Sequence, residues 1–177
     1  MKIASYCAQT FAQSARLVTG AEPITCPPTT AETFDPRDLE ADFLFIKLHG
    51  FKEQPFWYGD DWITALRADQ IAQADLSHTV AFVCNCFLPE SPMLQALHQA
   101  GAPWIIGGHG LNYARPDDAT ERGALSGPDY LALTMRRLLA WRIPPNVAFL
   151  IARKKLKIQR VHDLATKDAL KFEVFVS

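Results

Sequence analysis

Hydrophobic residues along this chain gather in short continuous runs, and the segments between the runs are more polar. Two of the runs, Phe43–Leu48 and Thr79–Asn85, have the length and the β-branched or aromatic content of buried strands. Shorter runs at Lys2–Cys7, Ile24–Cys26 and Pro103–Ile106 predict three further strands. An alternating pattern at the end of the chain, Lys171–Val176, is typical of an edge strand.

The segments between these runs carry helical spacing and helix-start signals such as a capping Ser, Thr or Asp and a first-turn proline. The expected helices are Thr10–Val18, Trp62–Ala72, Met93–Gln99, Asp129–Ile143 and Asn146–Leu156, with one helical turn at Asp35–Leu39. Gly50–Asp61 is expected to form an aromatic loop, and Leu111–Pro128 an irregular stretch. Strands that alternate with helices predict an α/β fold with a mostly parallel central sheet and helices on both faces.

Composition and charge narrow the class of protein. A chain of 177 residues fits a single domain that spans residues 1–177. The formal net charge of -1 gives no reason to expect a nucleic acid or an anionic membrane as partner. No apolar run approaches the roughly 20 residues of a membrane span, and the first residues lack the apolar core of a signal peptide. We therefore expect a cytoplasmic protein.

The cysteines are expected to be reduced thiols in that compartment. Four are present: Cys7, Cys26, Cys84 and Cys86. Cys84 and Cys86 are too close for a usual zinc-ligand pair, and no second pair faces them. The sequence thus predicts neither a metal nor another cofactor.

The two longest hydrophobic runs each lead to a residue that can take part in nucleophilic catalysis. His49 and Gly50 follow the first run, and Cys86 follows the second. The carboxyl ends of parallel strands share one edge of the sheet, where ligands bind in α/β folds. An imidazole can take the proton of a thiol and later protonate a leaving amine. The pattern predicts a Cys86 nucleophile and a His49 base in one crevice, with the N–H groups of Gly50 and Cys86 as oxyanion donors.

These blocks resemble the caspase-like cysteine peptidases, a group that includes caspases, gingipains, legumains, separase and the bacterial CHAT domains. Asp42–Gly50 resembles their histidine block, Val80–Cys86 their cysteine block, and Gly101–Gly108 the strand that follows. The similarity is closest to CHAT-type and gingipain-type domains. Asn85 stands where CHAT domains usually have alanine, and the caspase pentapeptide around the cysteine is absent, which argues against an Asp-specific caspase.

The resemblance implies a caspase-like three-layer sandwich that hydrolyses peptide bonds through a thioester acyl-enzyme. His49 would be the general base and acid, Cys86 the nucleophile, and Gly50 with the Cys86 amide the oxyanion hole. The substrate would be a protein or peptide, and a regulatory protein partner is compatible with the family.

Several positions admit more than one interpretation. Cys84 lies inside its apolar run, so we interpret it as core, with the nucleophile as the alternative. His109 also follows a strand and precedes a glycine; it lines the substrate cleft, is a plain loop residue, or replaces His49 as base. In the aromatic loop, Trp57 and Tyr58 either grip a substrate side chain or pack over the sheet edge. The other histidines, His78, His98 and His162, are expected at helix ends or on the surface.

Asp60 either supplies a carboxylate to a basic residue before the cleaved bond or is a solvated turn residue. Two functions other than a cysteine endopeptidase are compatible with the chain. One is a non-catalytic caspase-like interaction or sensor module within a larger assembly, and the other is a thiol amidase acting on a small molecule. A working site is expected to hold a Cys86 thiolate at neutral pH, whereas a scaffold cysteine is not.

Overall fold

A six-stranded sheet forms the centre of the computed structural model, which describes residues 1–112, 125–158 and 164–176. The strand order is β2 (Ile24–Cys26), β1 (Ile3–Ala8), β3 (Phe43–Lys47), β6 (Val80–Val83), β7 (Trp104–Gly108) and β8 (Phe172–Val176). The first five strands are parallel to their neighbours, and β8 runs antiparallel to β7. The sheet is therefore mixed but mostly parallel.

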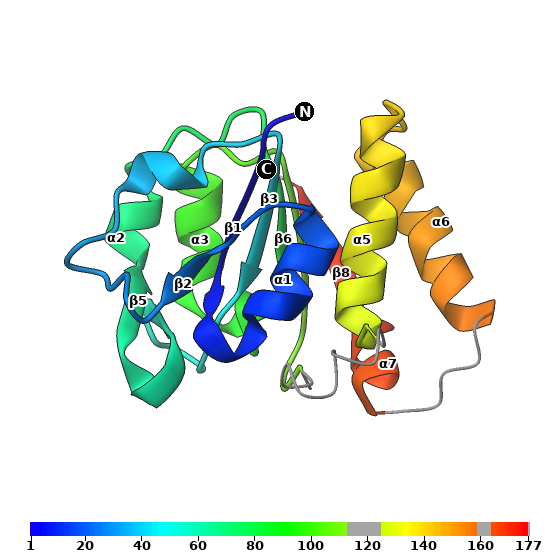
Figure 1. The fold of residues 1–177 in the computed structure, drawn as a ribbon. Coiled ribbons are helices and arrows are strands. Elements are labelled where there is room, and N and C mark those ends of the chain that lie inside the picture. Colours follow the sequence, from blue (N-terminus) through cyan, green and yellow to red (C-terminus); the bar gives the residue numbers. More distant parts are fainter. Residues whose placement is uncertain (113–124, 159–163, 177) are drawn as a thin grey trace.

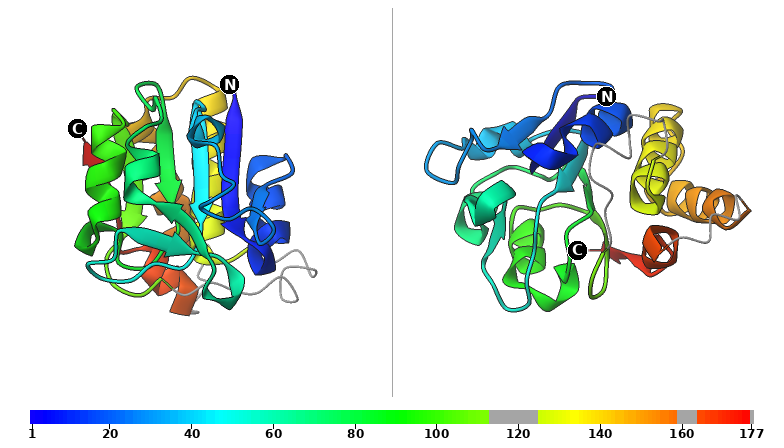
Figure 2. Two further views of the ribbon diagram at one scale, coloured as in Figure 1. Left: turned by 90° about the vertical axis from the view of Figure 1, so that its left-hand side faces the viewer. Right: turned by 60° about the horizontal axis from the view of Figure 1, so that its bottom comes forward.

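Helices cover both faces of this sheet, as Figures 1 and 2 show. On one face lie α1 (Ala12–Thr19) and α5 (Gly127–Ala140), which pack against each other. On the opposite face lie α2 (Ala68–Ile71) and α3 (Pro92–Gln99). Helix α6 (Pro145–Ile158) packs on the outer side of α5, and α7 (Leu164–Ala169) also contacts α5. The α/β class, with its mostly parallel sheet and helices on both faces, is confirmed.

Strand β3 lies in the middle of the core. All five of its residues are buried, including Lys47. Its register pairs Ile46 with Tyr6 of β1 on one side and with Val83 of β6 on the other. Because β3 and β6 are adjacent and parallel, the segments that follow them leave the sheet side by side at the same edge.

A two-stranded hairpin replaces the first half of one predicted helix. Strands β4 (Phe56–Tyr58) and β5 (Thr64–Arg67) pair antiparallel, and η3 (Asp60–Trp62) turns between them. The expectation of a helix over Trp62–Ala72 is therefore wrong before Ala68, where α2 begins. Cross-strand pairing, with Trp57 opposite Leu66, outweighs the local helical spacing.

Most other elements follow the sequence pattern to within a few residues. Ser91 caps α3 by accepting a hydrogen bond from Met93 N, and Pro92 fills the first turn. Asp35 caps η2 (Pro36–Leu39) in the same way. The first residues of the helix expected at Thr10–Val18 form the turn η1 (Gln9–Phe11) instead, whereas the turn η4 (Leu88–Glu90) and the helix α7 have no counterpart in the expectation.

Two expectations fall partly or wholly on residues that the structure does not describe. His162 lies outside the described residues, and so does most of the irregular stretch expected at Leu111–Pro128. Within the described parts of the chain, no helix has both the length and the apolar character needed to cross a membrane.

Candidate functional site at the carboxyl edge of the sheet

The segments that follow β3 and β6 are in direct contact. The Leu48 N–H donates a buried hydrogen bond of 2.7 Å to Oδ1 of Asn85. Gly50 packs closely against Cys86, the residue after Asn85. A Cβ atom added at Gly50 would lie 2.5 Å from the carbonyl oxygen of Cys86. Only glycine allows this approach of the two backbones. The structure thus brings together the His49-Gly50 block and the Cys86 block.

The His49 ring lies between two aromatic side chains. Its centroid is 5.6 Å from that of Phe11 and 5.4 Å from that of Trp62. The His49 backbone exchanges two hydrogen bonds with Tyr58 of β4, of 2.8 and 2.9 Å, so the hairpin fixes this residue. Burial lowers the pKa of His49 below its ordinary value, and the nearby Asp60 carboxylate opposes this shift. The imidazole is therefore neutral at neutral pH.

The Cys86 thiol faces a different neighbour. Its Sγ accepts a hydrogen bond of 3.3 Å from the Asn112 N–H. Burial raises the pKa of the Cys86 thiol, the Asn112 amide partly offsets the rise, and Asp168 adds to it. The next residue, Phe87, has a left-handed backbone with φ of 56°, an unfavourable conformation for a bulky side chain.

The side chains of His49 and Cys86 are both uncharged in this conformation. Among the described residues, no hydrogen bond or ion pair joins His49 to Cys86: the imidazole contacts the hairpin side, and the thiol contacts the segment after β7. The expected Cys86 thiolate at neutral pH does not agree with the raised pKa of this thiol. A neutral imidazole is nevertheless the form that can accept a proton from a neutral thiol.

Two asparagines surround the Cys86 backbone. The Asn112 side chain donates from Nδ2 to the Asn85 carbonyl oxygen at 2.6 Å, and both residues are buried. Nδ2 of Asn85 and Oδ1 of Asn112 are buried and have no hydrogen-bond partner within the described part of the chain. Through its side-chain oxygen, Asn85 therefore links the segment after β3 to the segment after β6, and its Nδ2 group beside Cys86 is left without a hydrogen-bond acceptor within the described part of the chain.

The predicted substrate-binding residues divide into exposed and buried positions. Trp57 is fully buried, so its indole offers no surface to a substrate, and this part of the expectation is corrected. Tyr58 is partly exposed beside His49. Asp60 accepts a hydrogen bond of 2.8 Å from Thr10 N and acts electrostatically on His49, so it belongs to the surroundings of the imidazole.

His109 lies between two carboxylates at the end of β7. Its Nε2 is 3.3 Å from Glu173 and its Nδ1 is 3.8 Å from Glu90. With Phe87 and Asn112 it lines a hollow of about 600 Å³ next to Cys86, which Asp168 and Lys171 also line. No hydrogen bond joins His109 to Cys86 among the described residues. Its position is that of a cleft residue.

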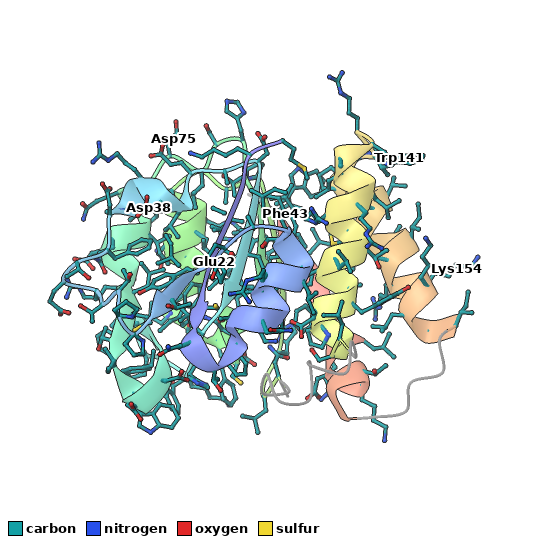
Figure 3. The ribbon with its side chains drawn as sticks, in the orientation of Figure 1. Glu22, Asp38, Phe43, Asp75, Trp141 and Lys154 are labelled. Atoms are coloured by element: carbon teal, nitrogen blue, oxygen red, sulfur yellow. The ribbon has the colours of Figure 1, made fainter. Side chains whose placement is uncertain are left out.

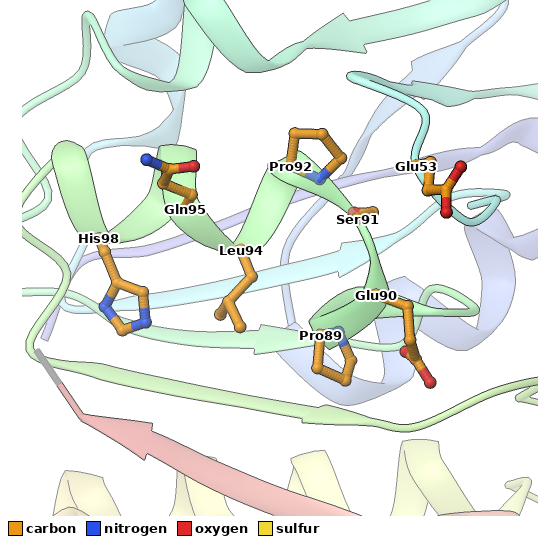
Figure 4. A pocket seen from close by; sticks show the side chains of 8 residues that line it. All are labelled: Glu53, Pro89, Glu90, Ser91, Pro92, Leu94, Gln95 and His98. Atoms are coloured by element: carbon orange, nitrogen blue, oxygen red, sulfur yellow. The ribbon is translucent and has the colours of Figure 1, made fainter.

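A second hollow, of about 540 Å³, lies over η4 and α3 and is drawn in Figure 4. The carboxylates of Glu53 and Glu90 lie at one end of it and the His98 ring at the other. Its hydroxyl, on Ser91, is occupied in capping α3. This hollow therefore lacks an available nucleophile and is distinct from the Cys86 site.

The sequence did not indicate the buried ion pair beneath the site. Lys47 Nζ lies 2.8 Å from Asp129 of α5 and donates a hydrogen bond of 2.7 Å to Ser14 of α1. Ser126 donates to the same carboxylate. A lysine at the end of an apolar run is the one visible signal, because a buried strand rarely carries a charge without a partner.

Cys84 points into this buried region. Burial raises its pKa well above the ordinary value, and the Asp129 carboxylate raises it further, so the thiol stays protonated. This environment supports the interpretation of Cys84 as a core residue. Among the described residues, no three His, Cys, Asp or Glu side chains are placed to share a metal ion.

Comparison with known proteins adds no assignment to this geometry. No protein-family model matches the chain, and no curated protein matches it.

Proposed function

We propose that this protein is a cysteine endopeptidase of the caspase-like type, with Cys86 as nucleophile and His49 as general base and acid. The observation that carries the proposal is the contact between the two blocks, in which Gly50 packs on the Cys86 carbonyl group. Two segments that are distant in sequence meet at the sheet edge where ligands bind in α/β folds. Their order and residue types are those that the family resemblance implies.

The uncharged state of both side chains defines the proposed first step. On substrate binding, neutral His49 takes the Cys86 proton as the sulfur attacks the carbonyl carbon. The thioester forms when the C–N bond breaks and His49 returns this proton to the leaving amine. Water then hydrolyses the thioester. The step needs the imidazole and the thiol within hydrogen-bond reach, a contact that often tightens only in the complex.

A matched pair of cysteine variants tests the nucleophile. A peptide vinyl sulfone, which reacts with thiols, should label the wild-type protein and the Cys84→Ala variant but not Cys86→Ala. Intact mass and peptide mapping locate the label. Labelling that persists in Cys86→Ala would refute the assignment, and circular dichroism of each variant checks that the fold is kept.

One observation favours a second candidate, the non-catalytic interaction module. The Cys86 Sγ is engaged by Asn112, and its pKa is raised, as expected for a structural cysteine. A module of this kind would leave the peptide electrophile unreacted over hours while its Cys86 still reacts slowly with small alkylating agents at high pH. The same labelling experiment therefore separates the two functions.

A further inference from the structure

An exposed aromatic cluster lies against the His49 ring. Trp62 is 5.4 Å from the His49 centroid and 5.6 Å from that of Phe51, and Tyr58 contacts both aromatic rings. Trp62 is 63% exposed and Phe51 is 42% exposed. We call Phe51, Tyr58 and Trp62 the aromatic shelf. It offers a contiguous apolar surface directly beside a candidate catalytic group.

Two backbone hydrogen bonds stabilise the turn that carries Trp62. The Gly59 N–H donates to the Ile63 carbonyl oxygen, and the Ile63 N–H donates to that of Asp60. Trp62 has a left-handed backbone, with φ of 59°, and so does the residue before it. Non-glycine residues keep such conformations only where the surroundings enforce them, often at functional sites. The shelf is therefore formed before any ligand arrives, which reduces the entropic cost of binding.

The chemistry of the proposed reaction assigns the shelf to one side of the substrate. A general acid must reach the leaving amine, so the residue that follows the cleaved bond lies on the His49 side. A hollow of about 560 Å³ extends from the shelf to the residue after Cys86; the aromatic side chains of Phe51, Tyr58 and Phe87 line it together with Lys52 and Gln54. A chain bound across Cys86 would thus pass its leaving-group half over the shelf.

We propose that the aromatic shelf binds an apolar or aromatic side chain on the residue that follows the cleaved bond. This inference rests on the proposed peptidase function and adds the class of substrate. Apolar side chains gain by leaving water for this surface.

Cleavage of a peptide library, analysed by mass spectrometry, tests the preference. Peptides with Phe or Leu after the cut should be cleaved about tenfold faster than those with Gly or Asp. Trp62→Ala should remove most of this ratio while cleavage continues. Trp141→Ala is the matched control, because Trp141 is 85% exposed at the far end of α5, as Figure 3 shows. An unchanged ratio in Trp62→Ala, or a preference for Lys, Arg or Asp, would overturn the proposal.

A binding measurement tests the shelf without requiring catalysis. Phenylalanine amide, which mimics the leaving group, should shift the Trp62 indole N–H signal in NMR spectra of the Cys86→Ala protein, and glycine amide should shift it much less. Equal shifts of this signal with both amides would overturn the shelf, and the Trp141 indole signal, which should not move with either amide, is the internal control. Binding of the amide without any peptide cleavage by the wild-type protein would support the shelf and contradict the peptidase function. Peptide cleavage whose preference is the same in Trp62→Ala and wild type would support the peptidase function and contradict the shelf.

Discussion

At the scale of single residues, opposing neighbours set the proton affinity of His49. Burial, to which Phe11 and Trp62 contribute, favours the neutral imidazole, and the Asp60 carboxylate favours the imidazolium. The net result is a pKa below the ordinary value. His49 is thus prepared to accept a proton, and Asp60 determines how firmly it would hold one.

Replacing Asp60 by asparagine should lower the pKa of His49 further, because the variant loses the charge that stabilises the imidazolium. An NMR titration of the His49 ring measures the change. Asp61→Asn is the control, because the carboxylate that raises the His49 pKa is that of Asp60. Equal titration curves for Asp60→Asn and wild type would contradict this role.

The same shift links His49 to stability. Because the folded-state pKa is the lower one, the unfolded chain binds the proton more readily below about pH 6.5. His49 therefore reduces stability as the pH falls from there through its folded pKa. Urea unfolding should show that the free energy of unfolding falls less at acidic pH in His49→Gln than in wild type. An identical pH dependence in the two proteins would contradict a lowered His49 pKa.

Gly50 packs directly on the backbone of the Cys86 block. An added methyl group would meet the Cys86 carbonyl oxygen at 2.5 Å, so Gly50→Ala should destabilise the protein by about 1–3 kcal/mol. Gly110→Ala is the comparison: its φ of +66° is unfavourable, but nothing lies within 4 Å of the new methyl group. That variant should lose only about 1 kcal/mol. Chemical denaturation of both variants compares their losses of stability. A Gly50→Ala variant that loses no more stability than Gly110→Ala would contradict a close contact at Gly50.

His49, Gly50 and Cys86 could be predicted because each follows a hydrophobic run whose end fixes its position. Asn112 could not, because its loop has no periodic pattern, although it donates the hydrogen bond to Cys86. Helical spacing predicts that Trp62 lies in a helix, but its place beside His49 depends on a left-handed turn that spacing does not reveal.

At the scale of elements, a buried ion pair joins β3 to α5. Lys47 and Asp129 are each almost fully buried, and Ser14 of α1 and Ser126 complete the hydrogen bonding. Such a pair specifies one arrangement of its elements more than it adds net stability. It sets where α5 begins against the strand that carries His49.

Breaking this pair should be costly. Lys47→Met leaves the Asp129 carboxylate buried without its partner, and we expect a loss of about 3–5 kcal/mol. The double variant Lys47→Met/Asp129→Leu should recover much of that loss, since no charge is then left alone. Arg37→Met, which breaks an exposed surface pair with Asp35, should reduce the stability far less than Lys47→Met, because water screens that pair. Urea denaturation of the three variants tests this order, and a double variant as unstable as the single one would contradict it.

The strands of the sheet could be predicted at this scale because each is a compact apolar run. The hairpin β4–β5 could not, because its pairing partner is supplied by tertiary structure and its residues have mixed spacing. Its consequence is structural: the hairpin, and not a helix, places Tyr58 and Trp62 beside His49.

At the scale of the whole molecule, the sheet topology creates the candidate site. The order β1-β3-β6-β7 places the ends of the His49, Cys86 and His109 strands along one edge. The alternation of strands and helices predicted this architecture. It could not predict that the His49 and Cys86 side chains would face different neighbours along that edge, because this depends on loop packing.

The resting site should behave as a protonated thiol. The rate of Cys86 alkylation by iodoacetamide should keep rising above pH 8.5, the ordinary thiol pKa being about 8.5, since burial raises this pKa. Mass spectrometry of the Cys86 peptide follows the rate. A plateau near pH 7 would contradict the uncharged resting pair.

The central claim is that Cys86 and His49 act together on a peptide, and the labelling rate of a peptide vinyl sulfone tests it most directly. The rate should be compared in wild type and His49→Ala, with iodoacetamide at pH 9 as the reference for thiol accessibility. The account predicts at least a tenfold slower reaction of Cys86 with the peptide reagent in His49→Ala and little change with iodoacetamide. Equal rates with the peptide reagent in both proteins would contradict it.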